Sequence, residues 1–492
     1  MTKISMFYKG LALLVSIFML CCISGTAEAQ ERPGKSCVST ELDKVLKGFD
    51  DQPSTVKENK ELDDALKGFE EGEGAAEEST QKEEAKKPPF CGLSGSLSLG
   101  VSYSFAHDPP KLGETDYRGL SRLRPDFHLN LDLAFLENWK ALISGRAFYD
   151  FVYEINGRDK YTDEVLDEYE KEAKFREAYL QGSLLASLDL KVGRQIVVWG
   201  KSDNIRVVDV LNPLDNREPG LVDIEDLRLP VTMTKLDYYL GKWNLTAIAV
   251  HEIRFNKNPV FGSEFFPLET PLPEEKKPTN SLDNTEYALA LNGIFSGWDI
   301  SFYEARFFDD QPHIESVSPA HLERRHSRLS MIGTAVNIAL GNWLLKSEAA
   351  YFDGLEFFAV PGEKKSRFDM LAGVEYSGFT NTTISLEAVN RHINDFHSTL
   401  KAPPDSAQKD EFQTVLRYSG DFLNDTLHLV MLASTFGVTG DDGALQRFSV
   451  EHDVTDAISI KLGLVTYRSG DKIQFRNMGD NDRLFFEANY SF

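Results

Sequence analysis

The feature that most constrains this chain is a recurring alternation of apolar and polar residues. Stretches of about ten residues with this pattern follow one another from Gly92 to Phe492, from "LSGSLSLGVSYSF" near the start to "LFFEANYSF" at the end. A repeat of two places every second side chain on the same face of a β-strand. Taken alone, the closing stretch would also fit a soluble β-sandwich. A tall apolar face opposite so polar a face is instead typical of strands with lipid outside and water inside.

The connections between these stretches give the number of strands. Short turns and long polar connections alternate along the chain, eight of the first kind and nine of the second. They join eighteen strands, or sixteen if the weak stretches 231–240 and 444–453 are not strands. The sequence thus predicts an all-β fold, a transmembrane antiparallel β-barrel of 16–18 strands. Both ends of the barrel chain then lie on the short-turn, periplasmic side.

The positions of tryptophan favour the same fold. Trp139, Trp243, Trp298 and Trp343 lie in or just after four of the short turns. A soluble core would scatter them along the strands, whereas an aromatic girdle at one membrane interface gathers them at one end. Phe492 then fits the terminal residue by which the barrel-assembly machinery recognises such a chain. Outer-membrane lipid would surround the barrel.

The first 29 residues have the pattern of a signal peptide. Lys3 and Lys9 precede the apolar run "LALLVSIFMLCCI", and small residues at Ala27 and Ala29 mark a cleavage site. A membrane anchor is the alternative. We expect export to the outer membrane of a Gram-negative bacterium, with an acidic periplasmic tail at 30–91 and the barrel at 92–492.

The tail is rich in Glu, Lys, Gly, Ser and Pro, so most of it is predicted to be disordered. It holds two similar stretches, "ELDKVLKGFDD" and "ELDDALKGFEE", whose apolar residues fall on one face of a short helix. We expect this face to bind a periplasmic protein; a plug in the lumen and a plain spacer are the alternatives. The docking residues are Leu42, Leu46, Phe49, Leu62, Leu66 and Phe69. Cys37 and Cys91 flank both copies, and an exported chain is able to oxidise them to a disulfide.

Charged residues on the polar faces of the strands are expected to line the lumen, because charges are expensive against lipid. One interpretation is a solvated wall of mutually paired charges. The other is a selectivity surface whose acidic and basic residues orient a polar solute. The candidates on the strands are Arg146, Asp150, Glu154, Glu177, Lys191, Glu387, Arg391 and Arg417.

The alternation breaks in the segment Lys191 to Pro230. The parity of Val192 would send Arg194 into lipid, so we expect a bulge at Gly193 that turns Arg194 inward. The long connection that follows carries apolar residues from Ile205 to Leu211, which predicts that it is buried. We expect it to fold into the barrel and narrow it, with an exposed loop as the alternative. Its candidate constriction residues are Arg194, Gln195, Trp199, Asn212 and Asp215.

The stretch "GRQIVVWGKSDNIRVVDVLNPLD" followed by "LRLPV" resembles a family of proteobacterial outer-membrane barrels of unknown function, distantly akin to alginate-export porins. The resemblance covers the chain from about Gly92 to Phe492 and depends on the GRQ, WG and NP-D elements. It implies a barrel with a signal peptide. Because some members are encoded beside transporters or periplasmic lipid-carrier-like proteins, it also implies traffic of lipidic or other hydrophobic compounds.

The sequence favours a channel over an enzyme. No nucleophile elbow, phosphate loop or zinc-protease motif is present, and the histidines of "HIESVSPAHLERRH" match no recognised metal spacing. We therefore expect no enzymatic activity, cofactor, metal or nucleic-acid partner. The expected function is an outer-membrane channel or porin-like protein that passes a small or lipidic solute. The alternative is the outer-membrane component of an export system that receives cargo from a periplasmic or inner-membrane transporter.

Overall fold

The computed structural model describes residues 90–492, apart from residues 111–114, 137 and 319–320. The signal peptide, the helical repeats of the tail and Cys37 lie outside the described residues, so the expectations for them remain predictions. The first strand, β1 (Phe90–Ser104), begins two residues before the predicted start of the barrel at Gly92. Cys91 therefore belongs to this strand, where it lies opposite Leu133.

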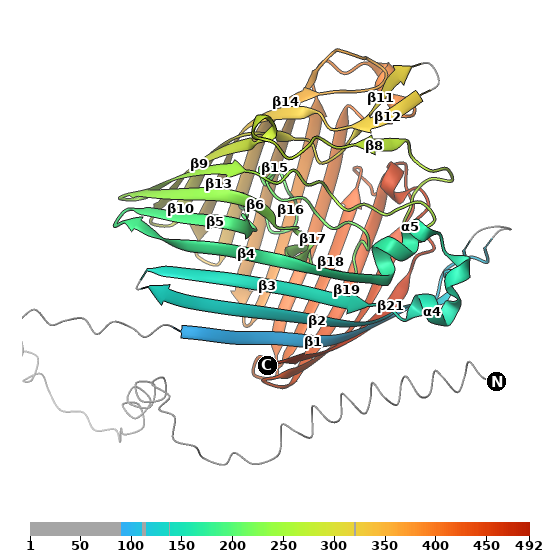
Figure 1. Cartoon of the computed structure of the whole chain (residues 1–492), viewed down its shortest axis with the longest axis horizontal. Helices are drawn as coiled ribbons and strands as arrows, with labels where there is room; N and C mark the ends of the chain where they lie inside the picture. Colours follow the sequence, from blue (N-terminus) through green and yellow to red (C-terminus); the bar gives the residue numbers. More distant parts are fainter. Residues whose placement is uncertain (1–89, 111–114, 137, 319–320) are drawn as a thin grey trace, which may run out of the picture. The chain divides into compact units, whose positions relative to one another are not determined.

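Eighteen antiparallel strands form one closed barrel (Figure 1). Each barrel strand pairs with the next one along the chain, and β1 closes the barrel against β21. Eight short turns and nine long connections join the strands, so the predicted fold class and strand number are confirmed. The remaining barrel strands are β2 (Gly119–Leu136), β3 (Trp139–Tyr149), β4 (Lys171–Leu185), β5 (Leu188–Gln195), β6 (Val231–Leu240), β7 (Trp243–Val250), β9 (Glu286–Phe295), β10 (Trp298–Phe308), β13 (Arg328–Leu340), β14 (Trp343–Leu355), β15 (Lys365–Phe379), β16 (Thr382–Ile393), β17 (Asp410–Phe422), β18 (Leu427–Phe436), β19 (Gly443–Thr455), β20 (Ile458–Arg468) and β21 (Arg483–Ser491).

The last residue of the chain takes part in closing the barrel. Phe492 and Gly95 exchange two backbone hydrogen bonds of 2.9 Å, which extend the ladder between β21 and β1. The Phe492 ring lies over Phe127 of β2, with 6.4 Å between ring centroids. The apolar-polar ending is therefore the eighteenth strand, and no barrel edge is left unpaired.

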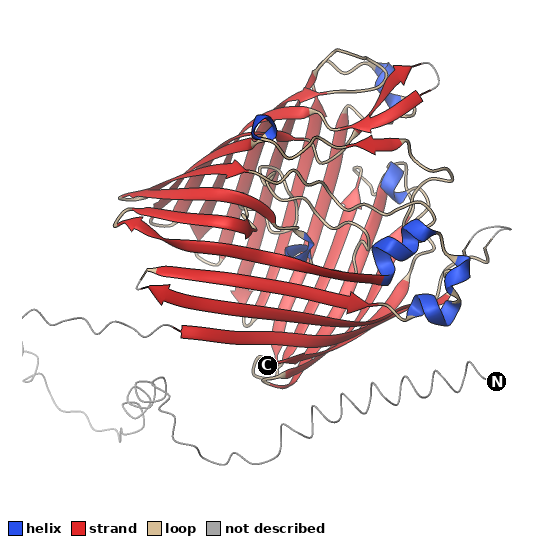
Figure 2. Ribbon diagram, in the orientation of Figure 1, coloured by secondary structure: helices blue, strands red, loops and turns tan. Residues whose placement is uncertain are grey.

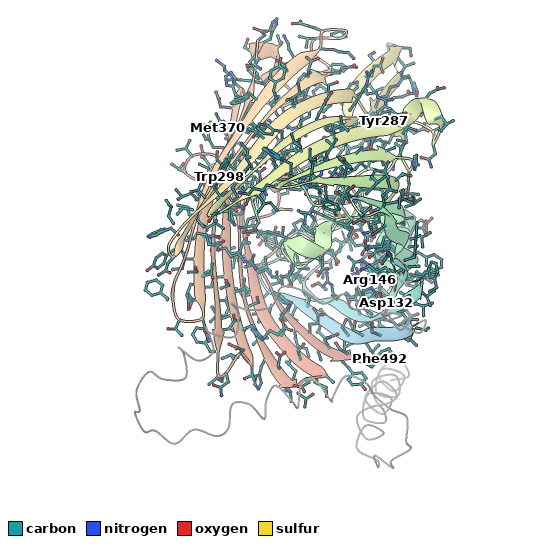
Figure 3. The ribbon with its side chains drawn as sticks, turned by 90° about the vertical axis from the view of Figure 1, so that its left-hand side faces the viewer. Asp132, Arg146, Tyr287, Trp298, Met370 and Phe492 are labelled. Atoms are coloured by element: carbon teal, nitrogen blue, oxygen red, sulfur yellow. The ribbon has the colours of Figure 1, made fainter. Side chains whose placement is uncertain are left out.

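Side chains alternate between an apolar outer face and an inner face along each strand. Tyr287, Trp298 and Met370 are exposed on the outer face, whereas Asp132 and Arg146 have the opposite parity (Figure 3). Trp139, Trp243, Trp298 and Trp343 each begin a strand directly after a short turn. The predicted aromatic girdle at the short-turn end is therefore present.

Substitution of Leu131 by Arg tests the outer face. Leu131 pairs with Leu93 and Ile143, which are 62% and 40% exposed, so it lies on the lipid side of β2, opposite a residue four positions after Trp139 of the aromatic girdle. We expect Leu131→Arg to lower the free energy of unfolding in vesicles by about 2–4 kcal/mol, because the charge must enter hydrocarbon. The inward-facing neighbour supplies the control, since Asn130→Arg should change this free energy little. Equal effects of the two substitutions would contradict the assignment of faces.

The long connections carry short helices and a small second sheet (Figure 2). The sequence predicted only loops there, but β8 (Glu274–Lys276), β11 (His313–Ser318) and β12 (His321–Arg325) form a three-stranded sheet outside the barrel wall. In the described part of the chain, no helix is long and apolar enough to cross a membrane. The short helices and helical turns are α4 (Val152–Asn156), η2 (Arg158–Lys160), α5 (Asp163–Val165), η3 (Leu166–Glu170), η4 (Ile224–Leu227), η5 (Leu282–Asn284), η6 (Ser398–Lys401) and η7 (Ile473–Phe475).

One predicted strand is shorter than expected. β3 ends at Tyr149, so Asp150 and Glu154 do not lie on its inner face as predicted. Asp150 is 1% exposed and accepts hydrogen bonds from the backbone N–H groups of Leu123 and Val152, which ends the strand. Glu154 lies on the short helix α4 and accepts a hydrogen bond from the Tyr149 hydroxyl. The local side-chain acceptors, rather than the alternation of apolar residues, decide where this strand stops.

Candidate functional site

The long connection between β5 and β6, residues 196–230, folds into the barrel and is called the inner loop below. Its first part reaches the opposite wall, where Glu348 of β14 and Glu387 of β16 are 2% and 1% exposed. Glu348 accepts hydrogen bonds from the backbone N–H groups of Lys201 and Ser202. Glu387 accepts a hydrogen bond of 2.8 Å from the Ser202 hydroxyl and one of 3.0 Å from the Asp203 backbone N–H. Two buried wall carboxylates thus bind consecutive amides of the loop.

Gly200 makes this approach possible. Its φ of +90° is in the left-handed region, and a Cβ there would lie 2.5 Å from a Glu348 carboxylate oxygen. Only glycine accepts both the conformation and the close contact without strain. The "WG" element of the sequence is therefore explained by the docking of the inner loop. Trp199, just before it, is buried with its ring 4.8 Å from that of Tyr303 on β10.

The apolar residues of the inner loop pack on the barrel wall, as predicted from their burial requirement. Val207, Val208 and Leu211 are at most 3% exposed and belong to one apolar cluster with inward-facing residues of β6 to β17. Met233 and Leu371 are examples of these wall residues, and both are 0% exposed. The expectation of a polar inner face is therefore wrong for this half of the barrel at the level of the loop, because the loop covers the wall with its own apolar side chains.

The later part of the inner loop reaches the other side of the barrel through ion pairs. Glu218 accepts two hydrogen bonds from Arg124 of β2, at 2.9 and 3.1 Å, and lies 2.6 Å from Arg122. Asp223 pairs with Arg447 of β19 and Lys461 of β20. Because the same loop is bonded to β14 and β16 through its first part, it bridges the lumen and narrows it.

Asn212 holds the two ends of the inner loop together. It is 0% exposed; its side-chain oxygen accepts from the Val197 N–H, and its amide donates to the Gln195 and Leu229 carbonyls. Gln195 is equally buried and donates to the Met233 carbonyl on β6. The predicted constriction residues Gln195 and Asn212 therefore position the loop, while Asp215 forms an ion pair with Arg217 at 2.6 Å within it.

The predicted bulge at Gly193 is wrong. The pairing of β5 with β4 and with β6 continues without a shift through Gly193, so Arg194 keeps the outward parity of Val192. Gly193 has a φ of +127°, but the extra residue lies in β4, between Ala178 and Phe175. Arg194 is accommodated because its guanidinium pairs with Glu252 at 3.1 Å at the end of β7.

The remaining predicted wall residues fall into two groups. Arg391 donates to the Arg206 carbonyl at 3.4 Å, and Glu177 accepts the Ile196 N–H at 3.1 Å, so both contact the inner loop. Arg146 instead pairs with Asp126, and Lys191 lies over the Tyr179 ring at 3.6 Å. Arg417 shares the inward parity of Glu387 on the neighbouring strand and is not part of the cluster at the inner loop.

A second loop covers the first. Residues 251–285, called the outer loop below, connect β7 to β9. The backbones of Lys257 and Leu214 meet in a 2.9 Å hydrogen bond, so the two loops are paired directly. The outer loop then reaches β21, where Glu264 accepts two hydrogen bonds from Arg483 at 3.0 and 2.7 Å. Above the inner loop, a cavity of about 1110 Å³ opens between the outer loop and the rim, with Phe255, Arg254 and Arg391 in its lining.

Two histidines fasten the outer loop at its two sides. His326 faces the Asp309 carbonyl with Nδ1 at 2.6 Å and Glu275 with Nε2 at 3.0 Å, and its ring stacks on Phe255. The two ring nitrogens thus connect Asp309, after β10, with Glu275 of the outer loop. The hydrogen bond from His326 is also the main reason that the pKa of Glu275 falls to about 2.

His107 has a similar arrangement on the other side, with Glu264 and Asp480 each 3.3 Å from a ring nitrogen. Burial alone would lower the pKa of His107, but the hydrogen bond and charge of Glu264 and the charge of Asp480 outweigh burial and the nearby Arg483. The pKa of His107 is therefore raised. A raised pKa means that the contact stabilises the folded loop at low pH and is lost as pH rises through the folded-state pKa.

The attachment of the outer loop to the rim should therefore weaken with rising pH. We expect hydrogen-exchange protection in 251–285, corrected for intrinsic rates, to fall as pH passes the folded-state pKa of His107. His107→Gln should remove this fall in protection with pH, because glutamine cannot become charged. His397→Gln is the control, since His397 is half-exposed and has only a 3.9 Å contact with Glu363. Identical pH profiles for the native chain and His107→Gln would refute the role of His107.

The ion pairs that attach both loops were not predicted from the sequence. Arg122, Arg124, Glu218, Asp223 and Glu264 were not singled out, although Glu218 and Asp223 lie in the segment predicted to constrict the lumen. The sequence does show that Arg122 and Arg124 lie on the polar face of one strand, because they are two residues apart. Their partners are far away in sequence, so the pairs themselves have no local pattern.

The closed barrel, the apolar outer face and the loop-filled lumen define the class: this is an outer-membrane, porin-like β-barrel protein. The sequence matches the family described as "Protein of unknown function (DUF1302)" over residues 113–492, and the chain belongs to this family. No curated protein matches it.

Two solved structures from Pseudomonas are similar to this chain. A BenF-like porin from Pseudomonas fluorescens Pf-5 is 12% identical, with 82% of this chain and 98% of the porin covered and a TM-score of 0.49. OccK2 (OpdF) of Pseudomonas aeruginosa is also 12% identical, with 82% and 97% covered and a TM-score of 0.47.

Proposed function

We propose that this protein is an outer-membrane channel that passes a small or lipidic solute, with the inner loop as its constriction. The observation that carries the proposal is the inner loop itself, which is bonded to β14 and β16 through Glu348 and Glu387 and to β2 through Glu218. A loop fixed at both sides of a lumen sets the width through which a solute must pass. The long-connection end then faces outward and the short-turn end faces the periplasm.

The chemistry of the cavity between the outer loop and the rim favours a solute with apolar surface. Its lining includes the aromatic side chains of Phe261, Phe266 and Phe357. The side at β2, β19 and β20 presents cations that the loop carboxylates neutralise. A molecule that enters this cavity and then passes the inner loop meets one apolar and one polar surface, which suits an amphipathic solute better than a small inorganic ion.

Purified protein in planar bilayers tests the proposal. Discrete conductance steps, reduced by micromolar amphipathic solutes but not by a hydrophilic solute of equal size, are the expected result. A correctly assembled barrel that remains electrically silent at all voltages would refute a channel. Block by the hydrophilic solute alone would refute the proposed solute class.

A further inference from the structure

The outer face of β10 carries two charges where lipid would be expected. Along this face Phe302, Glu304, Arg306 and Phe308 follow one another, and Glu304 and Arg306 are both exposed. Neither of these two side chains forms an ion pair or hydrogen bond with another described residue. Their outward parity is firm, because the intervening Tyr303, Ala305 and Phe307 are at most 6% exposed and face the interior.

Glu304 lies within the apolar band rather than at its edge. It is six residues (304 − 298) beyond Trp298, which marks the aromatic girdle at the short-turn end. At ~3.3 Å per residue and a strand tilt of ~40°, it lies ~15 Å into a band ~25 Å tall. Among the described barrel strands, it is the one outward-facing charged residue more than three positions from either end of its strand.

Lipid cannot satisfy these groups. Acyl chains offer no donor to the Glu304 carboxylate, and a charge left in hydrocarbon is strongly unfavourable. The phosphates of the outer leaflet would attract Arg306 but repel Glu304, and they lie beyond its depth. A protein surface with both charge signs at the same depth would satisfy both residues.

This chain itself has such a surface beside β10. Arg194 of β5 and Glu252 after β7 form the outward ion pair described above, with Thr232 donating its hydroxyl to Glu252 at 2.8 Å. This flank covers the ends of β5, β6 and β7, and β9 lies between it and β10. The outer face of β7 includes the small residues Ala247 and Ala249, which allow close approach of another barrel.

We infer that the outer face from β5 to β10 is an interface between copies of this chain in the membrane. Glu304 and Arg306 of one copy meet the Arg194–Glu252 flank of the next copy, so each charge gains a partner of opposite sign. Two different flanks of one subunit that fit each other join identical subunits head to tail, and they form a ring when the rotation between neighbours closes. The partner is thus a second copy of this chain, held by paired charges inside an apolar contact.

Photocrosslinking of the full chain in outer membranes tests the interface. A photoreactive phenylalanine analogue replaces Phe302, which is 45% exposed next to Glu304. The matched control replaces Phe448 of β19, an outward phenylalanine that is 38% exposed on another side of the barrel. We expect a covalent adduct of twice the monomer mass, containing only this chain, from position 302 and not from position 448. No adduct, an adduct only with lipopolysaccharide, or one only with another protein would overturn the inference.

A charge-removing variant distinguishes the interface from a lipid contact. If the face touched lipid, Glu304→Leu with Arg306→Leu would leave the monomer at least as stable, because both charges leave hydrocarbon. At the proposed interface the same double substitution should remove most of the adduct from position 302 while the barrel remains heat-modifiable on gels. An unchanged adduct yield in the double variant would overturn the role of the charges.

Discussion

Deletion of Val207 to Glu218 from the inner loop should raise the single-channel conductance several-fold. This segment contains Val207, Val208 and Leu211, which fill space against the wall, and Glu218, which binds Arg122 and Arg124 across the lumen. Without it the loop loses these apolar contacts with the wall and its ion pairs with Arg122 and Arg124, so the space that they fill becomes open. The conductance of a pore depends most on its narrowest part, so the change should be large and visible in the first open steps.

A deletion at the rim provides the control for this result. Residues 360–362 lie in the connection between β14 and β15, are largely exposed and do not contact the inner loop. Their removal should leave the conductance near that of the native chain. If the shortened inner loop gave unchanged or lower conductance in a barrel with native heat-modifiability, the inner loop would not be the constriction.

The strands could be predicted because lipid imposes a rule on each residue independently. A residue such as Leu131 must be apolar if it faces outward, whatever lies elsewhere in the chain. The alternation therefore predicted all eighteen strands. The tryptophans at the starts of β3, β7, β10 and β14 identified the short-turn end of the barrel. The strand ends were predicted less well, as at Asp150, where a single side chain accepts hydrogen bonds from two backbone N–H groups.

The inner face could not be predicted in the same way, because its environment depends on which loop covers it. In "EYALALNGIF", the sequence of β9, both faces are apolar, and Ala288 and Ala290 are buried beneath loop and wall neighbours. A continuous apolar run in a strand indicates burial on both faces. That signal was present, but the alternation of the other strands outweighed it. The ion pair of Glu218 with Arg124 joins residues 94 positions apart and leaves no local trace.

The prediction for Arg194 failed for a different reason. A charge with outward parity was expected to be turned inward by a bulge, because a charge is unfavourable against lipid. The structure instead keeps the ladder regular and supplies Glu252 from the end of another strand as a partner. A long-range partner can thus replace a local distortion. The sequence of β5 alone does not distinguish the two solutions.

Removal of the carboxylates of Glu348 and Glu387 should free the inner loop while leaving the barrel intact. Four consecutive N–H groups, from Lys201 to Asn204, donate to these two side chains. Each buried N–H that loses its acceptor costs about 1–3 kcal/mol unless water replaces it. In the double variant Glu348→Ala with Glu387→Ala we expect the first part of the loop to leave the wall, so that open-channel current fluctuates rapidly between levels.

The glutamine variants separate loss of the acceptor from loss of the charge. Glu348→Gln with Glu387→Gln keeps one carbonyl oxygen at each position, so the loop amides retain part of their hydrogen bonding, and the current should be quieter than in the alanine variant. Lys346 keeps its ion pairs with Asp203 and Glu375 in both double variants. If the alanine variant conducted as quietly as the native chain, the wall carboxylates would not hold the loop. The constriction would then depend on the apolar contacts of Trp199, Val207 and Val208 and on the ion pairs of Glu218 and Asp223.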